Sequence, residues 1–300
     1  MLDKKYVTFY ARSSRVPLDV AERDVVLTYV LKVLSESILQ RLAFKGGTCL
    51  KKMYFGSSGR FSMDLDFTSL NMSLENLQSE LKQLLDERNH FGINFKIAEE
   101  NVRTGAGACE QSYIAVIGYS HGWNAGEFMF EVSYREKPLL SLDKLPLLDE
   151  MYFKFCEFPR FPVQCLQKEE LIAEKLRAAF QRFRGRDLYD LYLFSDRHFD
   201  KGLVKKFAVI KCWSVREPFS PQELLNNISK LKYDWTDLEQ LVRKGELPSQ
   251  NEVIGKVLKA YAFLENMDST LLNIIDDSKA HKEKELVTTV LETLKPDYQG

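Results

Sequence analysis

Residues 46–67, which read GGTCLKKMYFGSSGRFSMDLDF, hold the groups of this chain best suited to chemistry. Asp64 and Asp66 are two residues apart, so in a strand they share a face, about 6.5–7 Å apart along the chain. Two carboxylates this close repel each other, whereas Mg²⁺ prefers hard oxygen ligands and is often shared with substrate phosphates. The Gly46-Gly47 turn lets backbone approach a phosphate that a Cβ would keep away. The spacing predicts a site for a metal ion and a nucleotide.

Three short elements must position these groups. The pattern predicts a strand over Leu42–Lys45 that leads into the glycine turn, and then a helix over Thr48–Tyr54 whose N-terminus faces the turn. A helix N-terminus favours anions. A strand over Ser62–Thr68 carries the two aspartates. Lys52 is expected on a solvated face of this helix. For Lys51 the sequence does not decide between a solvated face and another environment.

The rest of the first half predicts a mixture of helices and strands. Helical spacing covers residues 18–39 and 74–89. Alternating or aromatic runs predict strands over residues 93–99, 113–119, 127–134 and 151–158. In the strand 127–134, Glu131 lies on the face opposite Phe128, Phe130 and Val132. It would therefore project away from the packed face.

The second half predicts helices alone, and we place the domain boundary between residues 165 and 166, near Pro159 and Pro162. A mixed domain over residues 1–165 would precede a helical domain over 166–300. Helices are expected over residues 168–183, 188–194, 203–210, 221–231, 236–243, 252–265 and 282–294.

Composition excludes several classes of protein. The chain has 300 residues, 45% of them hydrophobic, which is enough for a substantial core and argues against disorder. A net charge of −1 excludes a globally basic nucleic-acid binder but not a local basic groove. Five cysteines without a Cys-x-x-Cys pair and four scattered histidines favour reduced thiols over a zinc site or disulfide framework. With no apolar signal core and no run of about 18 apolar residues, a cytoplasmic protein without a membrane span is expected.

A second group of charged residues lies in the segment 174–190, EKLRAAFQRFRGRDLYD. Lys175 and Arg182 are two helical turns apart and share a face, and Asp187 and Asp190 can share one as well. The surrounding cations form the most basic cluster near a candidate site: Lys168, Lys175, Arg177, Arg182, Arg184 and Arg186. Taken alone, this pattern is also that of a solvated amphipathic helix.

Together the two segments resemble the AbiEii/AbiGii-type nucleotidyltransferase family. The matching residues are Lys45-Gly46-Gly47-Thr48-x-Leu50, Arg60-Phe61-Ser62-x-Asp64-x-Asp66-Phe67, Glu174-Lys175-Leu176-Arg177-Ala178 and Arg186-Asp187-Leu188-Tyr189-Asp190. The family comprises toxins of type IV toxin–antitoxin and phage abortive-infection systems, is related to the MenT toxins, and acts in antiviral defence. The match spans roughly residues 40–195.

The resemblance implies an α+β fold with a DNA polymerase β-like nucleotidyltransferase core, a mixed or antiparallel sheet with helices, followed by a helical domain that contributes Lys175 and Asp187 to the cleft. It implies that Asp64, Asp66 and a third carboxylate hold Mg²⁺ or Mn²⁺. Glu131 is the candidate for that third ligand, and the alternative is an exposed strand residue paired with Arg135 or another cation. The NTP phosphates would contact Gly46, Gly47, Thr48 (including its hydroxyl), Arg60, Ser62 and Lys175. Asp187 would be needed for activity, either to orient Lys175 or to contact the base or acceptor.

The resemblance also implies partners. The NMP acceptor would be RNA, with the tRNA 3′ end supported best, and the transfer would inhibit growth. The lysines at 201, 205, 206 and 211 would extend the basic surface for RNA. A cognate antitoxin that acts as a DNA-binding repressor is implied by the family alone. The competing hypotheses are a nucleotidyltransferase that modifies a protein or small molecule, and a non-catalytic nucleotide- or RNA-binding module.

Overall fold

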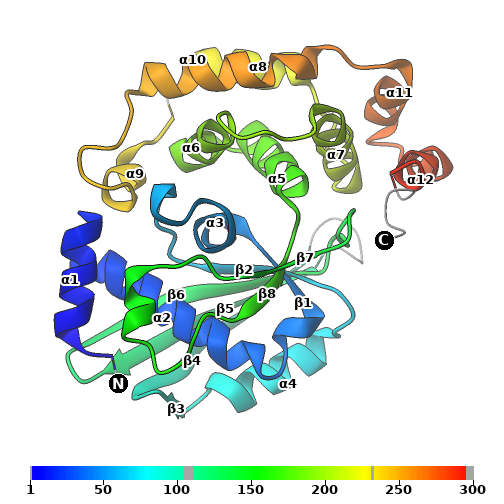
Figure 1. The fold of residues 1–300 in the computed structure, drawn as a ribbon. Helices are drawn as coiled ribbons and strands as arrows, with labels where there is room; N and C mark the ends of the chain where they lie inside the picture. The colour runs from blue at the N-terminus through cyan, green and yellow to red at the C-terminus, as the bar shows by residue number, and fades with distance from the viewer. Residues whose placement is uncertain (1, 105–110, 231–232, 295–300) are drawn as a thin grey trace. The chain divides into compact units, whose positions relative to one another are not determined.

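The strands of residues 42–165 form one eight-stranded sheet (Figure 1). This computed structural model describes residues 2–104, 111–230 and 233–294. The strand order is β3-β4-β5-β6-β2-β1-β8-β7, and the sheet is mixed because β2 pairs with β6 and β1 with β8 in parallel, while the other neighbours are antiparallel. The strands are β1 (Leu42–Lys45), β2 (Leu65–Ser69), β3 (Arg88–His90), β4 (Ile93–Thr104), β5 (Gln111–His121), β6 (Asn124–Ser133), β7 (Asp143–Pro146) and β8 (Pro162–Cys165).

Contacts divide the chain into two compact units. The first comprises the chain up to Pro138, Leu142–Leu166 and Leu238–Leu247, and the second comprises the remainder. The main crossing between them follows Leu166, but the chain returns to the first unit over residues 238–247, which the sequence pattern did not predict. In that returning segment the Leu241 carbonyl accepts from the Phe61 amide at 2.8 Å.

Helical segments complete both units. The first unit contains α1 (Lys4–Ser14), α2 (Leu18–Ser35), η1 (Leu39–Arg41), α3 (Gly46–Cys49), the π-helical η2 (Leu50–Phe55), η3 (Gly56–Ser58), α4 (Leu74–Leu85) and η4 (Met151–Lys154). The second contains α5 (Lys168–Gln181), α6 (Gly185–Phe194), α7 (Lys201–Ser214), α8 (Pro221–Lys230), α10 (Gln250–Tyr261), η5 (Ala262–Glu265), α11 (Ser269–Asp277) and α12 (Lys284–Glu292), while α9 (Thr236–Leu241) spans the return point. None of the helices in the described ranges is long and apolar enough to cross a membrane.

Several predicted elements differ from the structure. The strand expected over residues 151–158 is wrong: backbone bonds such as Phe155 N–H to Tyr152 O close local turns, and the rings pack inward, Tyr152 on Tyr10 and Phe158 on Tyr29. The helix expected over 74–89 ends at Leu85, and β3 follows. Helices α1 and α11 and strands β7 and β8 were not predicted. Four cysteines lie in the described part of the chain and form no disulfide, whereas Cys109 lies outside it.

Lys52 lies in the interior of the first unit, so its predicted solvated position is wrong. Its ammonium donates to Asp24 Oδ1 at 2.8 Å, to the Asp24 carbonyl at 2.9 Å and to the Thr28 hydroxyl at 2.7 Å. The Tyr10 hydroxyl donates to Asp24 Oδ2 at 2.8 Å. This network ties η2, α2 and α1 together. The reason for the error is that a buried counter-charge on a distant helix has no local sequence signature.

Both side chains of this interior ion pair have a shifted pKa. Burial alone would raise the pKa of Asp24, but the nearby charges of Lys52 and Lys51 outweigh it and lower that pKa below its usual range. Burial also lowers the pKa of Lys52, against the opposing charge of Asp24. The pair therefore remains acceptable in the interior only while each charge keeps its partner.

Replacing Lys52 tests this dependence. We expect Lys52→Met to lower the free energy of unfolding by about 3–5 kcal/mol, because Asp24 would be left buried without its cation. Urea denaturation followed by circular dichroism measures the loss. The matched control is Lys82→Met, which breaks the exposed pair between Lys82 and Glu100 and should change stability little. Equal losses in the two variants would contradict a structural role for the buried network.

Candidate functional site

Strand register brings three charged residues together on one face of the sheet. Lys45 on β1 is the Cα partner of Asp66 on β2, and Asp66 is in turn the partner of Glu131 on β6. Residues in register on neighbouring strands point to the same face, and neighbouring strands lie about 4.8 Å apart. Asp66 therefore stands between a cation and a second carboxylate. Lys45 was not among the expected site residues, although its place before the glycine turn was visible in the sequence.

The opposite face of the same strands is apolar and fixes their position. Phe67 packs on Phe44 with ring centroids 5.2 Å apart and on Phe130 at 5.3 Å. All three rings are fully buried. Because side chains alternate along a strand, burying Phe67 and Phe130 obliges Asp66 and Glu131 to face the other way. The predicted placement of Glu131 away from the packed face is confirmed.

The glycine turn lies directly against Asp66, Arg60 and Ser62. Gly46 has a φ of +73°, and a Cβ there would sit 2.1 Å from Asp66 Oδ2. A Cβ on Gly47 would sit 2.7 Å from Arg60 Nη2 and 2.8 Å from Ser62 Oγ. The turn can approach these side chains only because both residues lack a Cβ. The structure thus unites the expected residues of the turn with three of the expected polar residues downstream.

Thr48 fixes the backbone at Asp64. Its side chain is fully buried, and its hydroxyl donates to the Asp64 carbonyl. The expectation that this hydroxyl donates to phosphate therefore does not match its bonding here, where it positions the aspartate instead. Strand β2 begins at Leu65, so Asp64 precedes the strand in which it was expected.

Lys51 holds the loop that leads to Ser62. This lysine is buried, its ammonium forms an ion pair with Glu150 and donates to the Gly56 carbonyl at 2.8 Å, and it lies 4.8 Å above the Phe61 ring. The buried Arg60 donates from Nη1 to the Phe61 carbonyl at 3.1 Å. The open question about Lys51 is settled in favour of a buried, structural cation. The loop that carries Arg60 and Ser62 is therefore held from several sides.

The acidic residues fit a hard divalent cation in donor type. Asp66 and Glu131 are adjacent carboxylates, and the space that a Gly46 Cβ would fill lies against Asp66 Oδ2. Glu131 Oε1 also lies 3.7 Å from Arg135 Nη2 in a partly exposed ion pair. This is the pairing expected if Glu131 were an exposed strand residue and not a metal ligand. Within residues 2–104, 111–230 and 233–294, no group of three or more His, Cys, Asp or Glu is arranged so that it could hold a metal ion. The observed geometry therefore supports two adjacent ligands, with Asp64 placed by Thr48 one residue before the strand.

In the second unit, Lys175 and Asp187 form a buried charge cluster between α5 and α6. The Lys175 ammonium lies 3.2 Å from Asp187 Oδ1 and 2.7 Å from Asp190 Oδ2. Arg182 donates from Nε to Asp187 Oδ2 at 2.8 Å, and Asp187 is fully buried. Arg182 follows the end of α5 at Gln181 in an extended conformation, so the two cations meet at Asp187 instead of sharing a face of one helix as their spacing predicted. Of the two roles left open for Asp187, this geometry favours orienting Lys175.

Lys211 does not extend a basic surface, and that expectation is wrong. Its ammonium is buried in ion pairs with Glu170 at 3.0 Å and Glu174 at 3.1 Å. Both glutamates lie on α5. Arg182 and Arg184, in contrast, are exposed in the segment between α5 and α6.

The sequence and the fold both resemble known proteins. The family model for the nucleotidyl transferase AbiEii toxin of type IV toxin–antitoxin systems matches residues 29–254. The structure of MenT4, a nucleotidyltransferase toxin from Mycobacterium tuberculosis H37Rv, is similar with a TM-score of 0.81 and 25% identity, covering 98% of this chain and 99% of that one. A Helicobacter pylori protein described as a nucleotidyltransferase shares the fold with a TM-score of 0.50 and 17% identity over 82% of this chain and 96% of its own. No curated protein matches this sequence.

The close approach of Gly46 makes a prediction about stability. We expect Gly46→Ala to lower the free energy of unfolding by about 1–3 kcal/mol, because the alanine must adopt a positive φ and its Cβ would meet the Asp66 carboxylate. The control is Gly255→Ala within α10, where a Cβ meets nothing within 4 Å and should stabilise the helix. Thermal and urea denaturation of both variants measure the difference. A Gly46→Ala protein as stable as the wild type would show that the turn does not need glycine.

Proposed function

The chain belongs to the AbiEii family of nucleotidyltransferase toxins of type IV toxin–antitoxin systems, and on that premise we propose that it transfers an NMP from an NTP to an RNA acceptor with a divalent metal ion. The observation that carries the proposal is the packing of the glycine turn against Asp66, with Glu131 in register beside it. This arrangement joins backbone that a phosphate can approach to carboxylates that a cation requires.

The phosphate end of the NTP would bind at the turn. The backbone amides that open the continuous helical segment of α3 and η2 suit phosphate oxygens, because they have no partner within the first helical turn. Arg60 and Ser62 lie beside Gly47, so they are placed to add a charge-assisted and a neutral hydrogen bond. In this proposal Thr48 acts indirectly, by holding Asp64 in position.

The carboxylates would serve the reacting groups. The adjacent Asp66 and Glu131 would hold Mg²⁺ or Mn²⁺, with Asp64 as the proposed third ligand from just before the strand. The metal ion when bound would lower the pKa of the acceptor hydroxyl and neutralise charge on the leaving pyrophosphate. Lys45, in register with Asp66, is placed to balance the negative charge of the carboxylates before a cation binds. Phosphoryl transfer depends mostly on positioning and charge neutralisation, which this fixed set of side chains would supply.

The acceptor in this proposal is RNA, with the tRNA 3′ end as the first candidate. Family membership and the likeness to the toxin MenT4 support the proposal that the transfer reaction inhibits growth. Such a toxin would act in the cytoplasm, where NTPs and tRNA are found, as part of an abortive-infection response. It would be restrained by a cognate antitoxin, which we propose to be a DNA-binding repressor.

Radiolabel transfer tests the proposed reaction. The purified chain would be incubated with each α-labelled NTP and Mg²⁺ or Mn²⁺, once with total RNA and once with total protein. We expect label on RNA, and a loss of at least about 100-fold in Asp66→Asn and Glu131→Gln, because each removes charge stabilisation at the reacting phosphate. Glu99→Gln, an exposed position on strand β4 of the same sheet, is the control that should keep activity.

The outcomes separate the competing hypotheses. Label on protein alone would overturn the RNA acceptor and favour a protein-modifying nucleotidyltransferase. Absence of label, together with toxicity that persists in Asp66→Asn, would overturn catalysis and favour a module that acts by sequestration.

A double-mutant cycle tests the role of Asp187. We propose that Lys175 binds the NTP phosphates and that Asp187 orients it through their contact at 3.2 Å. If so, Lys175→Met, Asp187→Asn and the double variant should lose activity to a similar degree, because both single changes remove one function. The measurement is kcat/KM for the NTP, with thermal melting to confirm folding. Losses that multiply in the double variant would show that Asp187 makes a contact of its own.

A further inference from the structure

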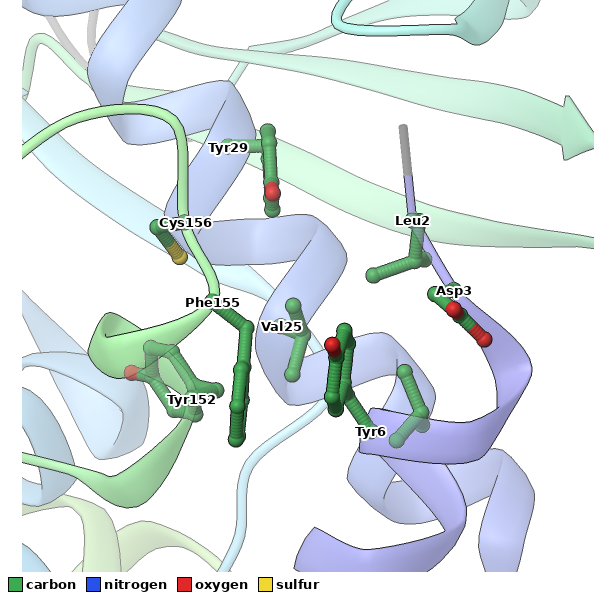
Figure 2. A pocket seen from close by; sticks show the side chains of 9 residues that line it. Leu2, Asp3, Tyr6, Val25, Tyr29, Tyr152, Phe155 and Cys156 are labelled. Carbon is green, nitrogen blue, oxygen red and sulfur yellow. The ribbon is translucent and has the colours of Figure 1, made fainter.

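The outward face of α1 carries large aromatic side chains in contact with solvent. Phe9 is 57% exposed, Tyr6 is 40% exposed, and Phe155 from the segment after η4 is 38% exposed. The rings of Tyr6 and Phe155 stack with centroids 3.8 Å apart and an interplanar angle of 6° (Figure 2). Phe9 follows Tyr6 by three residues and so lies on the same side of the helix. A cluster of exposed rings of this kind marks a surface that binds something.

The same helix is strongly basic. Its sequence, KKYVTFYARSS, contains Lys4, Lys5 and Arg12 and no acidic residue, in a chain whose net charge is −1. The nearest acid in sequence is the N-cap residue Asp3, whose carboxylate accepts from the Lys5 amide at 2.8 Å and is thus committed to the helix. The exposed rings are therefore accompanied by a local excess of positive charge.

The rings and the cations line one open surface pocket. Its volume is about 740 Å³, and its lining includes the acidic Asp3 together with Lys4, Lys5, Tyr6, Phe9, Arg12 and Phe155. This volume is within the range of sites that take small molecules and nucleotides, about 300–1,000 Å³. The pocket is open, which suits a chain that lies along the surface better than an enclosed ligand.

The buried face of α1 packs behind the loop of the candidate site. Tyr10 lies against Phe61, with ring centroids 6.1 Å apart, and Phe61 stands between Arg60 and Ser62. The Arg15 carbonyl after the helix accepts from the Lys244 amide at 3.0 Å. The aromatic and basic face thus belongs to a helix that directly supports the residues proposed to bind the NTP.

We propose that this face of α1 binds a single-stranded segment of the RNA acceptor, an inference that rests on the proposed function. Bases stack on Phe9 and on the Tyr6–Phe155 pair, and phosphates contact Lys5 and Arg12. Alternating rings and cations are what single-stranded nucleic acid requires, since every base offers a π-face and every linkage a charge. A protein partner fits less well, because protein interfaces are depleted in lysine, whereas Lys4 and Lys5 line the same pocket as the rings.

Binding measurements on point variants test the proposal. Fluorescence anisotropy with a labelled single-stranded RNA of mixed sequence should show an affinity loss of at least about fivefold for Phe9→Ala, because one stacked base is lost. Arg12→Ala should reduce the slope of log affinity against log salt by about 0.7. Affinity for a duplex of the same length should be unchanged in Phe9→Ala, because its bases cannot stack on the ring. Leu272→Ala and Lys259→Ala, both exposed on the second unit, are the matched controls.

Crosslinking gives a second, independent measurement. Ultraviolet irradiation of the wild-type complex followed by trypsin should place the nucleotide adduct on the peptide of residues 6–12, YVTFYAR. Failure of this inference can be told from failure of the proposed function. If RNA is labelled but Phe9→Ala binds single strands as tightly as Leu272→Ala, the surface assignment is overturned and the reaction stands. If Phe9→Ala weakens single-strand binding but only protein is labelled, this face of α1 does bind single-stranded RNA, and the proposal that RNA is the acceptor is overturned. Weaker binding of a protein partner with unchanged RNA affinity would also overturn the assignment.

Discussion

The contact between Gly46 and the Asp66 carboxylate is the constraint on which the site depends. β1 runs antiparallel to β2 with Lys45 opposite Asp66, so the chain leaves β1 at the carboxylate and must turn at once. Only a residue without a Cβ can make that turn at a φ of +73° with Asp66 Oδ2 so near. The turn then delivers Gly47 to Arg60 and Ser62, and Thr48 to the Asp64 carbonyl. One register therefore sets the position of each group of the glycine turn that is proposed to meet the NTP phosphates.

Two consecutive buried lysines keep this arrangement rigid. Lys51 binds the loop that precedes Ser62 through Glu150, the Gly56 carbonyl and the Phe61 ring, while Lys52 binds α2 through Asp24 and Thr28. Burying two ammonium groups is costly, and replacing such pairs with apolar side chains is often neutral for stability. Their value here is geometric, because each lysine joins the segment that follows the glycine turn to a different part of the first unit.

The sequence was informative where a local pattern decides the structure. The alternation in 127–134 placed Glu131 opposite the buried rings. The sequence was uninformative where contacts between residues far apart in the chain decide the structure. Helix α1 was missed because its buried side chains, Val7, Tyr10 and Ala11, are interrupted by exposed rings and cations that weaken the apolar period. The rings of the segment 151–158 resemble a strand pattern, but they pack on α1 and α2.

The same distinction applies to the site. Residue types and spacing along the chain selected Asp64, Asp66, Gly46 and Gly47, but pairing between strands is set by long-range packing, so no local pattern placed Glu131 and Lys45 on either side of Asp66. Likewise, four charges at helical spacing did not reveal that Asp187 is buried between Lys175 and Arg182. A buried carboxylate held by two cations has little freedom to meet a ligand directly, and it acts most effectively by fixing the cation beside it. Sequence alone therefore selected the residues of both clusters as candidates, while the fold determined which of them lie side by side and which hold others in place.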